Sequence, residues 1–192
     1  MTQIAVFASG SGTNAENLIR SWAGHKHLKI AVVMTNNPDA GVIGRAGKLG
    51  VPCMTFTRKQ FLEGDDVLKL LNEKKIDAII LAGFLLLIPK NIIHAFPEKV
   101  INVHPALLPA HGGKGFYGAN VHQAVINSGS VISGITIHKV NDRFDEGEII
   151  FQAACHVAKN DTAETLAEKI HQLEYKYFPV VAEKYFRSLN TV

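Results

Sequence analysis

Residues 4–14 read IAVFASGSGTN, an apolar run that passes directly into a glycine-rich loop. The first five of these residues are all apolar, which is typical of a short strand buried on both faces of a parallel sheet. The loop is followed at Ala15 to Ala23 by a pattern with helical spacing. A strand, a tight loop and a helix in this order predict the first unit of an α/β sheet.

The same alternation continues along the chain. We expect further strands at Lys29–Thr35, Pro52–Phe56, Ala78–Ala82 and Val100–His104, with helices at Val42–Leu49 and Asp65–Lys74. This order predicts an open, mostly parallel twisted sheet flanked by helices on both faces, a Rossmann-like α/β fold. In such sheets ligands bind outside the carboxyl ends of the strands, here just after Ala8, Ala82 and Val103.

The last third of the chain predicts a different arrangement. Ser133–Val140 and Ile149–Val157 alternate in part, and we expect an antiparallel edge hairpin joined by residues 141–148. A long helix should close the chain, with Asp161 as its cap and Glu164 completing a capping box. Pro179 should kink or break that helix.

Composition limits the classes of function. The chain has 192 residues, 47% of them apolar, and a formal net charge of +3. We expect a single domain over residues 1–192 with a substantial core. The charge suits a small anionic substrate but is too mild to indicate nucleic acid. The longest apolar stretch, Ala78–Pro89, is too short to cross a bilayer, and no signal peptide is evident, so we expect a cytoplasmic protein without a membrane partner.

The cysteines and histidines form no metal-binding motif. Cys53 and Cys155 lie far apart, and we interpret them as reduced thiols, with a disulfide as the less favoured alternative. The nine histidines show neither a His-Glu-x-x-His nor a Cys-x-x-Cys pattern. We therefore expect no metal.

The glycine loop at residues 10–14 is a candidate anion site. Its glycines let backbone N–H groups approach an anion, and a helix N-terminus adds partial positive charge. The loop lacks the lysine of a P-loop and the third glycine of a dinucleotide fingerprint. A tight turn with an asparagine cap is the alternative.

Asn102 and His104 form the second candidate site, at the end of the fifth strand. Alternation places both side chains on one face of the strand, roughly 7 Å apart. An amide donor beside an imidazole can hold a developing oxyanion, and the imidazole can exchange a proton near neutral pH. A hydrogen-bonded histidine at a strand end is the alternative interpretation.

Two further segments could contribute to the same site. Residues 142–148 carry four acids, Asp142, Asp145, Glu146 and Glu148, any of which could orient His104 and raise its pKa. A solvated turn is the alternative. The segment Gly112–Gly118 could be either a mobile active-site loop or a plain flexible connection.

Together these motifs resemble the phosphoribosylglycinamide formyltransferase family. The stretches that carry the resemblance are Ser-Gly-Ser-Gly-Thr-Asn (9–14), Leu-Ala-Gly-Phe (81–84), Asn-Val-His-Pro-Ala-Leu-Leu-Pro (102–109), Gly-Ile-Thr-Ile-His (134–138) and Asp-Glu-Gly-Glu-Ile-Ile-Phe-Gln (145–152). They stand in the family's order and cover almost the whole chain. The resemblance implies formyl transfer from 10-formyltetrahydrofolate to the amine of glycinamide ribonucleotide, in purine synthesis and without a metal.

The resemblance also implies roles for particular residues. Asn102, His104 and Asp145 would be the catalytic residues. The remaining implied positions bind the two substrates: Gly12, Thr13, Asn14, Gly83 and Glu174 for the ribonucleotide, and Leu85, Leu86, Leu87, Ile88 and Asn102 for the folate. Well-known family members carry an arginine where Leu86 stands. They also carry a further basic residue upstream, for which Arg58 or Lys59 could substitute.

Other functions fit part of the pattern. A 10-formyltetrahydrofolate deformylase would share the catalytic residues but would usually carry an additional N-terminal domain. A methionyl-tRNA formyltransferase would need a basic C-terminal domain. A non-catalytic nucleotide-binding module could keep the glycine loop alone. We expect the partners to be small molecules and the protein to be a monomer or a homodimer.

Overall fold

The computed structural model describes residues 1–189, in which seven strands form one sheet. The strands are β1 (Thr2–Phe7), β2 (Leu28–Thr35), β3 (Cys53–Thr55), β4 (Ala78–Leu81), β5 (Val100–His104), β6 (Ile132–Lys139) and β7 (Ile149–His156). Their order across the sheet is β3-β2-β1-β4-β5-β6-β7. The first five strands run parallel, whereas β6 is antiparallel to both β5 and β7. The predicted parallel sheet with an antiparallel edge pair is confirmed.

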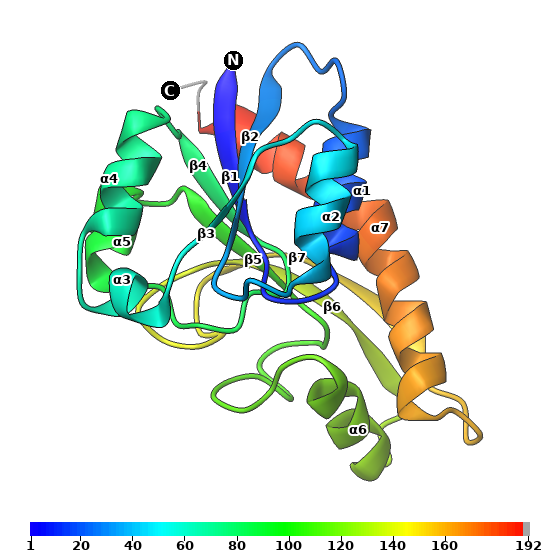
Figure 1. Ribbon diagram of the computed structural model, residues 1–192. Coiled ribbons are helices and arrows are strands. Elements are labelled where there is room, and N and C mark those ends of the chain that lie inside the picture. The colour runs from blue at the N-terminus through cyan, green and yellow to red at the C-terminus, as the bar shows by residue number, and fades with distance from the viewer. Residues whose placement is uncertain (190–192) are drawn as a thin grey trace.

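Residues 1–189 form seven helices. They are α1 (Thr13–Ser21), α2 (Gly41–Lys48), α3 (Arg58–Leu62), α4 (Asp66–Glu73), α5 (Lys90–Ala95), α6 (Ala119–Asn127) and α7 (Ala163–Ser188). Six of them cover the two faces of the sheet, and α6 lies beyond the strand ends beside α7 (Figure 1). α1, α2 and α7 lie on one side and α3, α4 and α5 on the other (Figure 1). The structure thus adds three helices that were not predicted, α3, α5 and α6.

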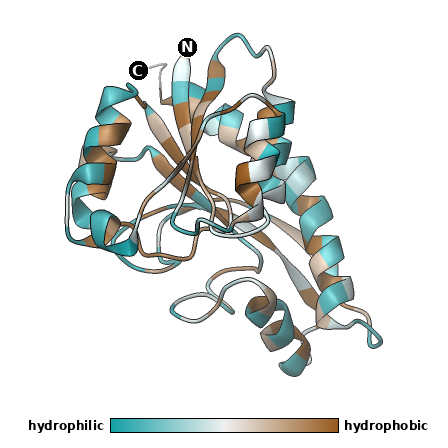
Figure 2. Ribbon diagram, viewed as in Figure 1, coloured by the Kyte–Doolittle hydropathy of each residue, from teal (hydrophilic) through white to brown (hydrophobic). Residues whose placement is uncertain are grey.

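The first strand shows how the sequence divides the core between the two faces. Ile4 and Val6 belong to the apolar cluster under α1, α2 and α7, while Ala5 and Phe7 belong to the cluster under α3, α4 and α5. Successive side chains on a strand point to opposite faces, so a strand covered by helices on both sides must be apolar throughout. The helices are amphipathic, with apolar residues toward the sheet and polar residues outward (Figure 2).

Two details of α7 correct the sequence interpretation. Thr162 is the N-cap and forms the capping box with Thr165, so the proposed pair of Asp161 and Glu164 is wrong. Asp161 instead accepts a hydrogen bond from the backbone N–H of Ala158 and pairs with Lys169. Pro179 does not break the helix, which continues to Ser188.

Packing explains why the helix continues through Pro179. The buried residues on either side of the proline, Phe178, Ala182 and Phe186, all belong to the apolar cluster on that face of the sheet. Burial of a phenylalanine side chain such as Phe178 or Phe186 stabilises the protein by roughly 1.5–3 kcal/mol, which is comparable to the cost of a proline within a helix.

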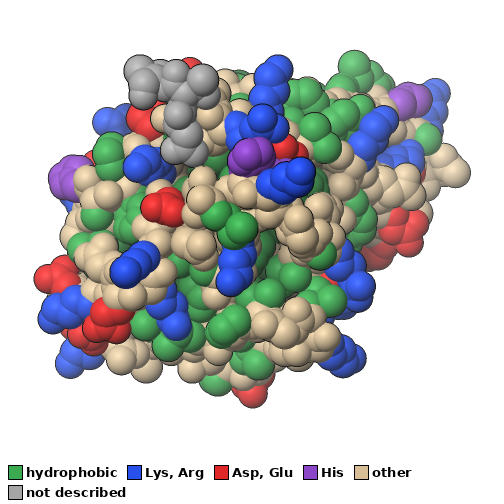
Figure 3. Space-filling model, turned by 90° about the horizontal axis from the view of Figure 1, so that it is seen from above, with side chains coloured by type: hydrophobic (Ala, Val, Ile, Leu, Met, Phe, Trp, Pro, Cys, Tyr) green, Lys and Arg blue, Asp and Glu red, His purple; other side chains and the backbone are tan. Residues whose placement is uncertain are grey.

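Charged side chains of both signs share the face of the molecule seen from above (Figure 3), and the two cysteines are not paired with each other. On the face seen from above, Lys and Arg side chains are scattered among acidic and apolar ones (Figure 3). Cys53 and Cys155 are both free thiols. No helix within residues 1–189 is long and apolar enough to cross a membrane.

Candidate active site

A cavity of about 520 Å³ opens at the carboxyl ends of β1, β4 and β5, where the strand order predicts a ligand site. Its walls come from the glycine loop, the segments that follow β4 and β5, the Gly113–Gly118 loop, and side chains of α6 and α7. Nine predicted site residues line it: Gly12, Thr13, Asn14, Gly83, Leu85, Asn102, His104, Asp145 and Glu174. A second cavity, of about 590 Å³, is lined by residues such as Met1 and Asp77 and contains none of the predicted groups.

The glycine loop is shaped by its contacts with α2. Gly12 is the N-cap of α1 with φ of 77°, a left-handed conformation that favours glycine. A Cβ at this position would lie 2.4 Å from Val42 Cβ. The loop therefore packs directly against α2, and only glycine fits there. The alternative of an asparagine cap is wrong, since no side chain caps α1.

Glu174 reaches this end of the cavity from α7. Its carboxylate accepts a hydrogen bond from Asn14 Nδ2 at 2.9 Å, and the residue is only 4% exposed. Burial raises the pKa of Glu174 to about 7, against a smaller lowering effect of the Asn14 hydrogen bond. Asn14 Oδ1 and His122 Nδ1 are also buried and have no protein partner. This end of the cavity thus holds polar groups that a polyhydroxylated ligand could satisfy.

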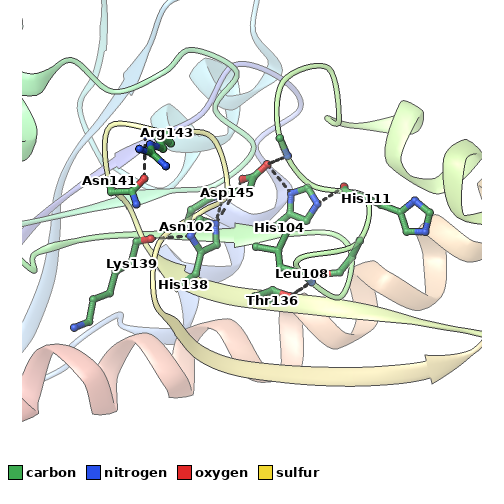
Figure 4. A network of polar contacts seen from close by, with 12 residues as sticks. Asn102, His104, Leu108, His111, Thr136, His138, Lys139, Asn141, Arg143 and Asp145 are labelled. Atoms are coloured by element: carbon green, nitrogen blue, oxygen red, sulfur yellow. Dashed lines mark hydrogen bonds and ion pairs between the residues drawn. The ribbon is translucent and has the colours of Figure 1, made fainter.

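The catalytic candidates meet at the end of β5 (Figure 4). His104 Nδ1 lies 3.6 Å from Asp145 Oδ2, and the two side chains are 4% and 12% exposed. Asp145 comes from the loop between β6 and β7, so the structure selects it from the four acids of that segment. Asn102 occupies the same face of β5, two residues before His104.

Burial dominates the electrostatics of this pair. Burial lowers the pKa of His104, whereas Asp145 and the His111 carbonyl act to raise it, and the net pKa lies below the ordinary 6.5. The expected influence of Asp145 is present but is outweighed. Burial alone would raise the pKa of Asp145, but His138, His104 and the Gly113 N–H together hold it below 3.8. At neutral pH the site therefore holds a carboxylate beside a neutral imidazole.

The start of the glycine-rich loop, residues 111–113, contacts both His104 and Asp145. His104 Nε2 lies 2.8 Å from the His111 carbonyl oxygen, and the Gly113 N–H donates to Asp145 Oδ2 at 2.9 Å. His111 and Asp145 both have positive φ, near 55° and 57°, which is uncommon for residues other than glycine. Both nitrogens of His104 therefore face protein groups, and a substrate that approaches Nε2 must displace the His111 carbonyl.

The predicted folate residues are only partly brought to the cavity. Leu85 lines it and is 45% exposed, and its N–H donates to Ser9 Oγ at 3.1 Å. Ile88 is buried in the core beneath α5, and Leu86 packs against the same apolar cluster. Leu87 is half-buried and, like these two, is not part of the cavity wall.

Other residues in the cavity wall were not predicted. They include Lys114, Phe116, Tyr117, His122 and His171. For two of them, the sequence spacing along a helix indicated the face on which the residue lies. His171 precedes Glu174 by three residues on one helix, which puts both on the same face. His122 has the same relation to the core residue Val125.

Similarity to known proteins agrees with this geometry. The fold is an open α/β sheet with a cavity at the strand ends, and Asn102, His104 and Asp145 line that cavity. The sequence model of the family described as formyl transferase matches residues 2–182. Phosphoribosylglycinamide formyltransferase of Bacillus subtilis is 33% identical over 96% of this chain and 94% of its own length. The chain belongs to the formyl transferase family, among the phosphoribosylglycinamide formyltransferases.

Two further relatives set the extent of the match. The chloroplastic phosphoribosylglycinamide formyltransferase of Arabidopsis thaliana is 38% identical over 92% of this chain. The chain spans about 62% of the Arabidopsis protein and about 60% of its Vigna unguiculata counterpart. Among solved structures, the phosphoribosylglycinamide formyltransferase of Bacillus halodurans has a TM-score of 0.85 at 33% identity, covering 95% of this chain and 94% of that one.

Proposed function

We propose that the protein transfers the formyl group of 10-formyltetrahydrofolate to the amine of glycinamide ribonucleotide, a step of purine synthesis. The observation that carries the proposal is one cavity that holds both the Asn102, His104 and Asp145 side chains and a glycine loop at a helix N-terminus. The loop offers backbone N–H groups to a phosphate, and the three side chains stand where an acyl carbon would react.

The ribonucleotide end of the cavity is formed by α1 and α7. The first N–H groups of α1 have no acceptor within the helix, so they are available to a phosphate. Asn14 on α1 and Glu174 on α7 lie side by side and offer hydrogen-bonding groups to ribose hydroxyls. The folate end includes Phe84, Leu85 and Phe144, whose apolar surfaces suit an aromatic ring.

The transfer needs no nucleophile from the protein, because the substrate amine attacks the formyl carbon itself. As the new C–N bond forms, negative charge develops on the formyl oxygen and positive charge on the amine nitrogen. Asn102 donates a hydrogen bond to that oxygen, an interaction worth roughly 3–4 kcal/mol in the transition state.

His104 accepts and then releases the proton that the substrate amine loses. It starts neutral, and its Nε2–H is fixed by the His111 carbonyl, so Nδ1 is the basic nitrogen. The amine proton reaches Nδ1 by way of the Asp145 carboxylate, which makes an imidazolium paired with Asp145. The proton then leaves Nδ1 through the same carboxylate and reaches the folate nitrogen as the bond between that nitrogen and the formyl carbon breaks, which restores the neutral imidazole.

The experiment measures loss of 10-formyltetrahydrofolate by the purified protein, with and without glycinamide ribonucleotide. Loss that requires the ribonucleotide and yields its formylated product is the expected result. An Asn102→Ala variant prepared in parallel should be slower by roughly 10²–10³-fold, which excludes a contaminating enzyme. Loss without the ribonucleotide would identify a deformylase, and no loss would refute formyl transfer. The cytoplasmic location, the single-domain organisation and the monomeric or homodimeric state stay predictions.

A further inference from the structure

His138 lies directly behind Asn102 in the sheet. The two residues are paired across the antiparallel β5 and β6, and the pairing of β6 with β7 shifts register between Ile137 and His138. Directly opposed residues share a face of the sheet, and a register shift re-aims the side chain beside it. His138 is 2% exposed and is not part of the cavity wall. Any effect it has on a substrate must pass through a neighbour.

The contacts of His138 define its tautomer. Nδ1 lies 2.7 Å from the Lys139 carbonyl oxygen, and a carbonyl can only accept, so Nδ1 carries the hydrogen. In a neutral imidazole Nε2 is then an acceptor. Asn102 Nδ2 lies 3.0 Å from Nε2 and donates to it (Figure 4). Asp145 Oδ1 lies 3.6 Å from the same nitrogen, beyond hydrogen-bond distance.

We propose that His138 is a positioning residue that holds the amide of Asn102 with its NH₂ group in place to donate to the developing oxyanion. The proposal rests on the formyl transfer proposed above. An amide nitrogen carries two hydrogens. His138 takes one of them and so fixes the plane of the amide, which leaves the second for the substrate.

The alternative orientation of Asn102 shows why the imidazole matters. A flipped amide would place Oδ1 against the lone pair of Nε2, and the same flip would present an acceptor where the formyl oxygen gains negative charge. Both contacts are repulsive in the flipped state, so the lone pair of His138 excludes the inactive orientation. Without it, the NH₂ group is free to turn toward Asp145 Oδ1, the acceptor 3.6 Å from Nε2.

Two substitutions separate positioning from a structural role. His138→Leu removes the acceptor, whereas His138→Gln carries an amide oxygen as many bonds from Cα as Nε2 and can accept from Asn102. His156→Leu is the matched control, since His156 is an exposed histidine of β7 whose Nδ1 also contacts a backbone carbonyl, that of Val131 at 3.1 Å. His138→Met replaces the leucine variant should the latter not fold, because methionine adapts to irregular space.

We expect His138→Leu to lower kcat roughly 10- to 100-fold, a part of the 10²–10³-fold that one oxyanion donor supplies. KM for the ribonucleotide should stay within about threefold, because the glycine loop and Glu174 are untouched. His138→Gln should recover most of kcat, and His156→Leu should match the wild type. In an Asn102→Ala background, His138→Leu should change kcat by less than about threefold, since the two residues act as one unit.

Several results would overturn the proposal. A leucine variant with wild-type kcat, a glutamine variant as slow as the leucine variant, or an undiminished effect in the Asn102→Ala background would each do so. The contact can also be tested without activity, by ¹⁵N NMR of the imidazoles. We expect His138 as the Nδ1–H tautomer, with a change at Nε2 on Asn102→Ala. A wild-type protein without formyl transfer would refute the proposed function, and a Nε2–H tautomer would refute the positioning contact.

Discussion

Glu174 should make the stability of the protein depend on pH in a way that one substitution removes. The residue is 4% exposed, and its carboxylate accepts a hydrogen bond from Asn14 Nδ2. Burial raises its pKa from 4.5 to about 7. Glu174→Gln keeps an oxygen for Asn14 and removes the ionisation.

The sign and size follow from linkage between protonation and folding. Below pH 4.5 the Glu174 carboxyl is protonated in both the folded and the unfolded protein, and its contribution to the free energy of unfolding is fully present. Between pH 4.5 and 7 the unfolded chain loses the proton while the folded protein keeps it, so the free energy of unfolding falls as pH rises. The two pKa values differ by about 2.5, and each pH unit corresponds to about 1.4 kcal/mol, which gives a loss of ~3 kcal/mol above pH 7.

The assay is urea unfolding of the wild type and Glu174→Gln at pH 4.5 and pH 8, without ligand. Between pH 4.5 and pH 8 the free energy of unfolding of the wild type should fall by ~3 kcal/mol more than that of Glu174→Gln. This difference corresponds to roughly 6–12 °C in Tm. Glu168→Gln, an exposed residue of the same helix, controls for loss of one negative charge. Parallel pH profiles for the wild type and Glu174→Gln would refute the raised pKa.

Three further predictions concern the catalytic centre. His104→Ala should lower kcat by roughly 10²–10⁴-fold while ribonucleotide affinity, measured by calorimetry, changes only a few fold, and lost affinity would make His104 structural. Asp145→Asn removes a group that raises the pKa of His104, so the acid limb of the pH–rate profile should move to lower pH; an unmoved limb would remove Asp145 from the mechanism. Gly112→Ala would place a Cβ 2.4 Å from Leu108 Cδ2 and 3.3 Å from Asp145 Cβ, and should lower kcat about 10-fold by shifting the carboxylate. Gly44→Ala, with open space at its Cβ, is the control, and equal activity of the two variants would show that the Asp145 carboxylate tolerates the shift.

The sequence predicts the sheet well because its strands are short apolar runs between clear loops. β1, β2, β4 and β5 lie within one or two residues of the predicted ranges. The unpredicted α3 and α5 have only five and six residues, too few to show a helical period. α6 follows a glycine-rich loop, and its stabilising contacts are tertiary ones with α7.

Site residues were predictable where a motif fixed their place on a strand or loop. Asn102 and His104 follow from alternation along β5, and the glycine loop from its position after β1. Leu86 and Ile88 turned toward the core because the chain after β4 leads directly into α5, a helix that the sequence did not indicate. The spacing of His122 and His171 indicates their helix faces, but no local pattern encodes the packing of α6 on α7 that brings both into the cavity.

The proposed catalytic centre depends on two long-range contacts, one at Asn102 and one at His104. The register of β5 with β6 puts His138 against Asn102, and the loop after β6 returns Asp145 to His104. The glycine-rich loop then closes over the pair through the His111 carbonyl and the Gly113 N–H. Because that carbonyl occupies Nε2 of His104, Nδ1 is the nitrogen left to exchange a proton, and it faces the Asp145 carboxylate.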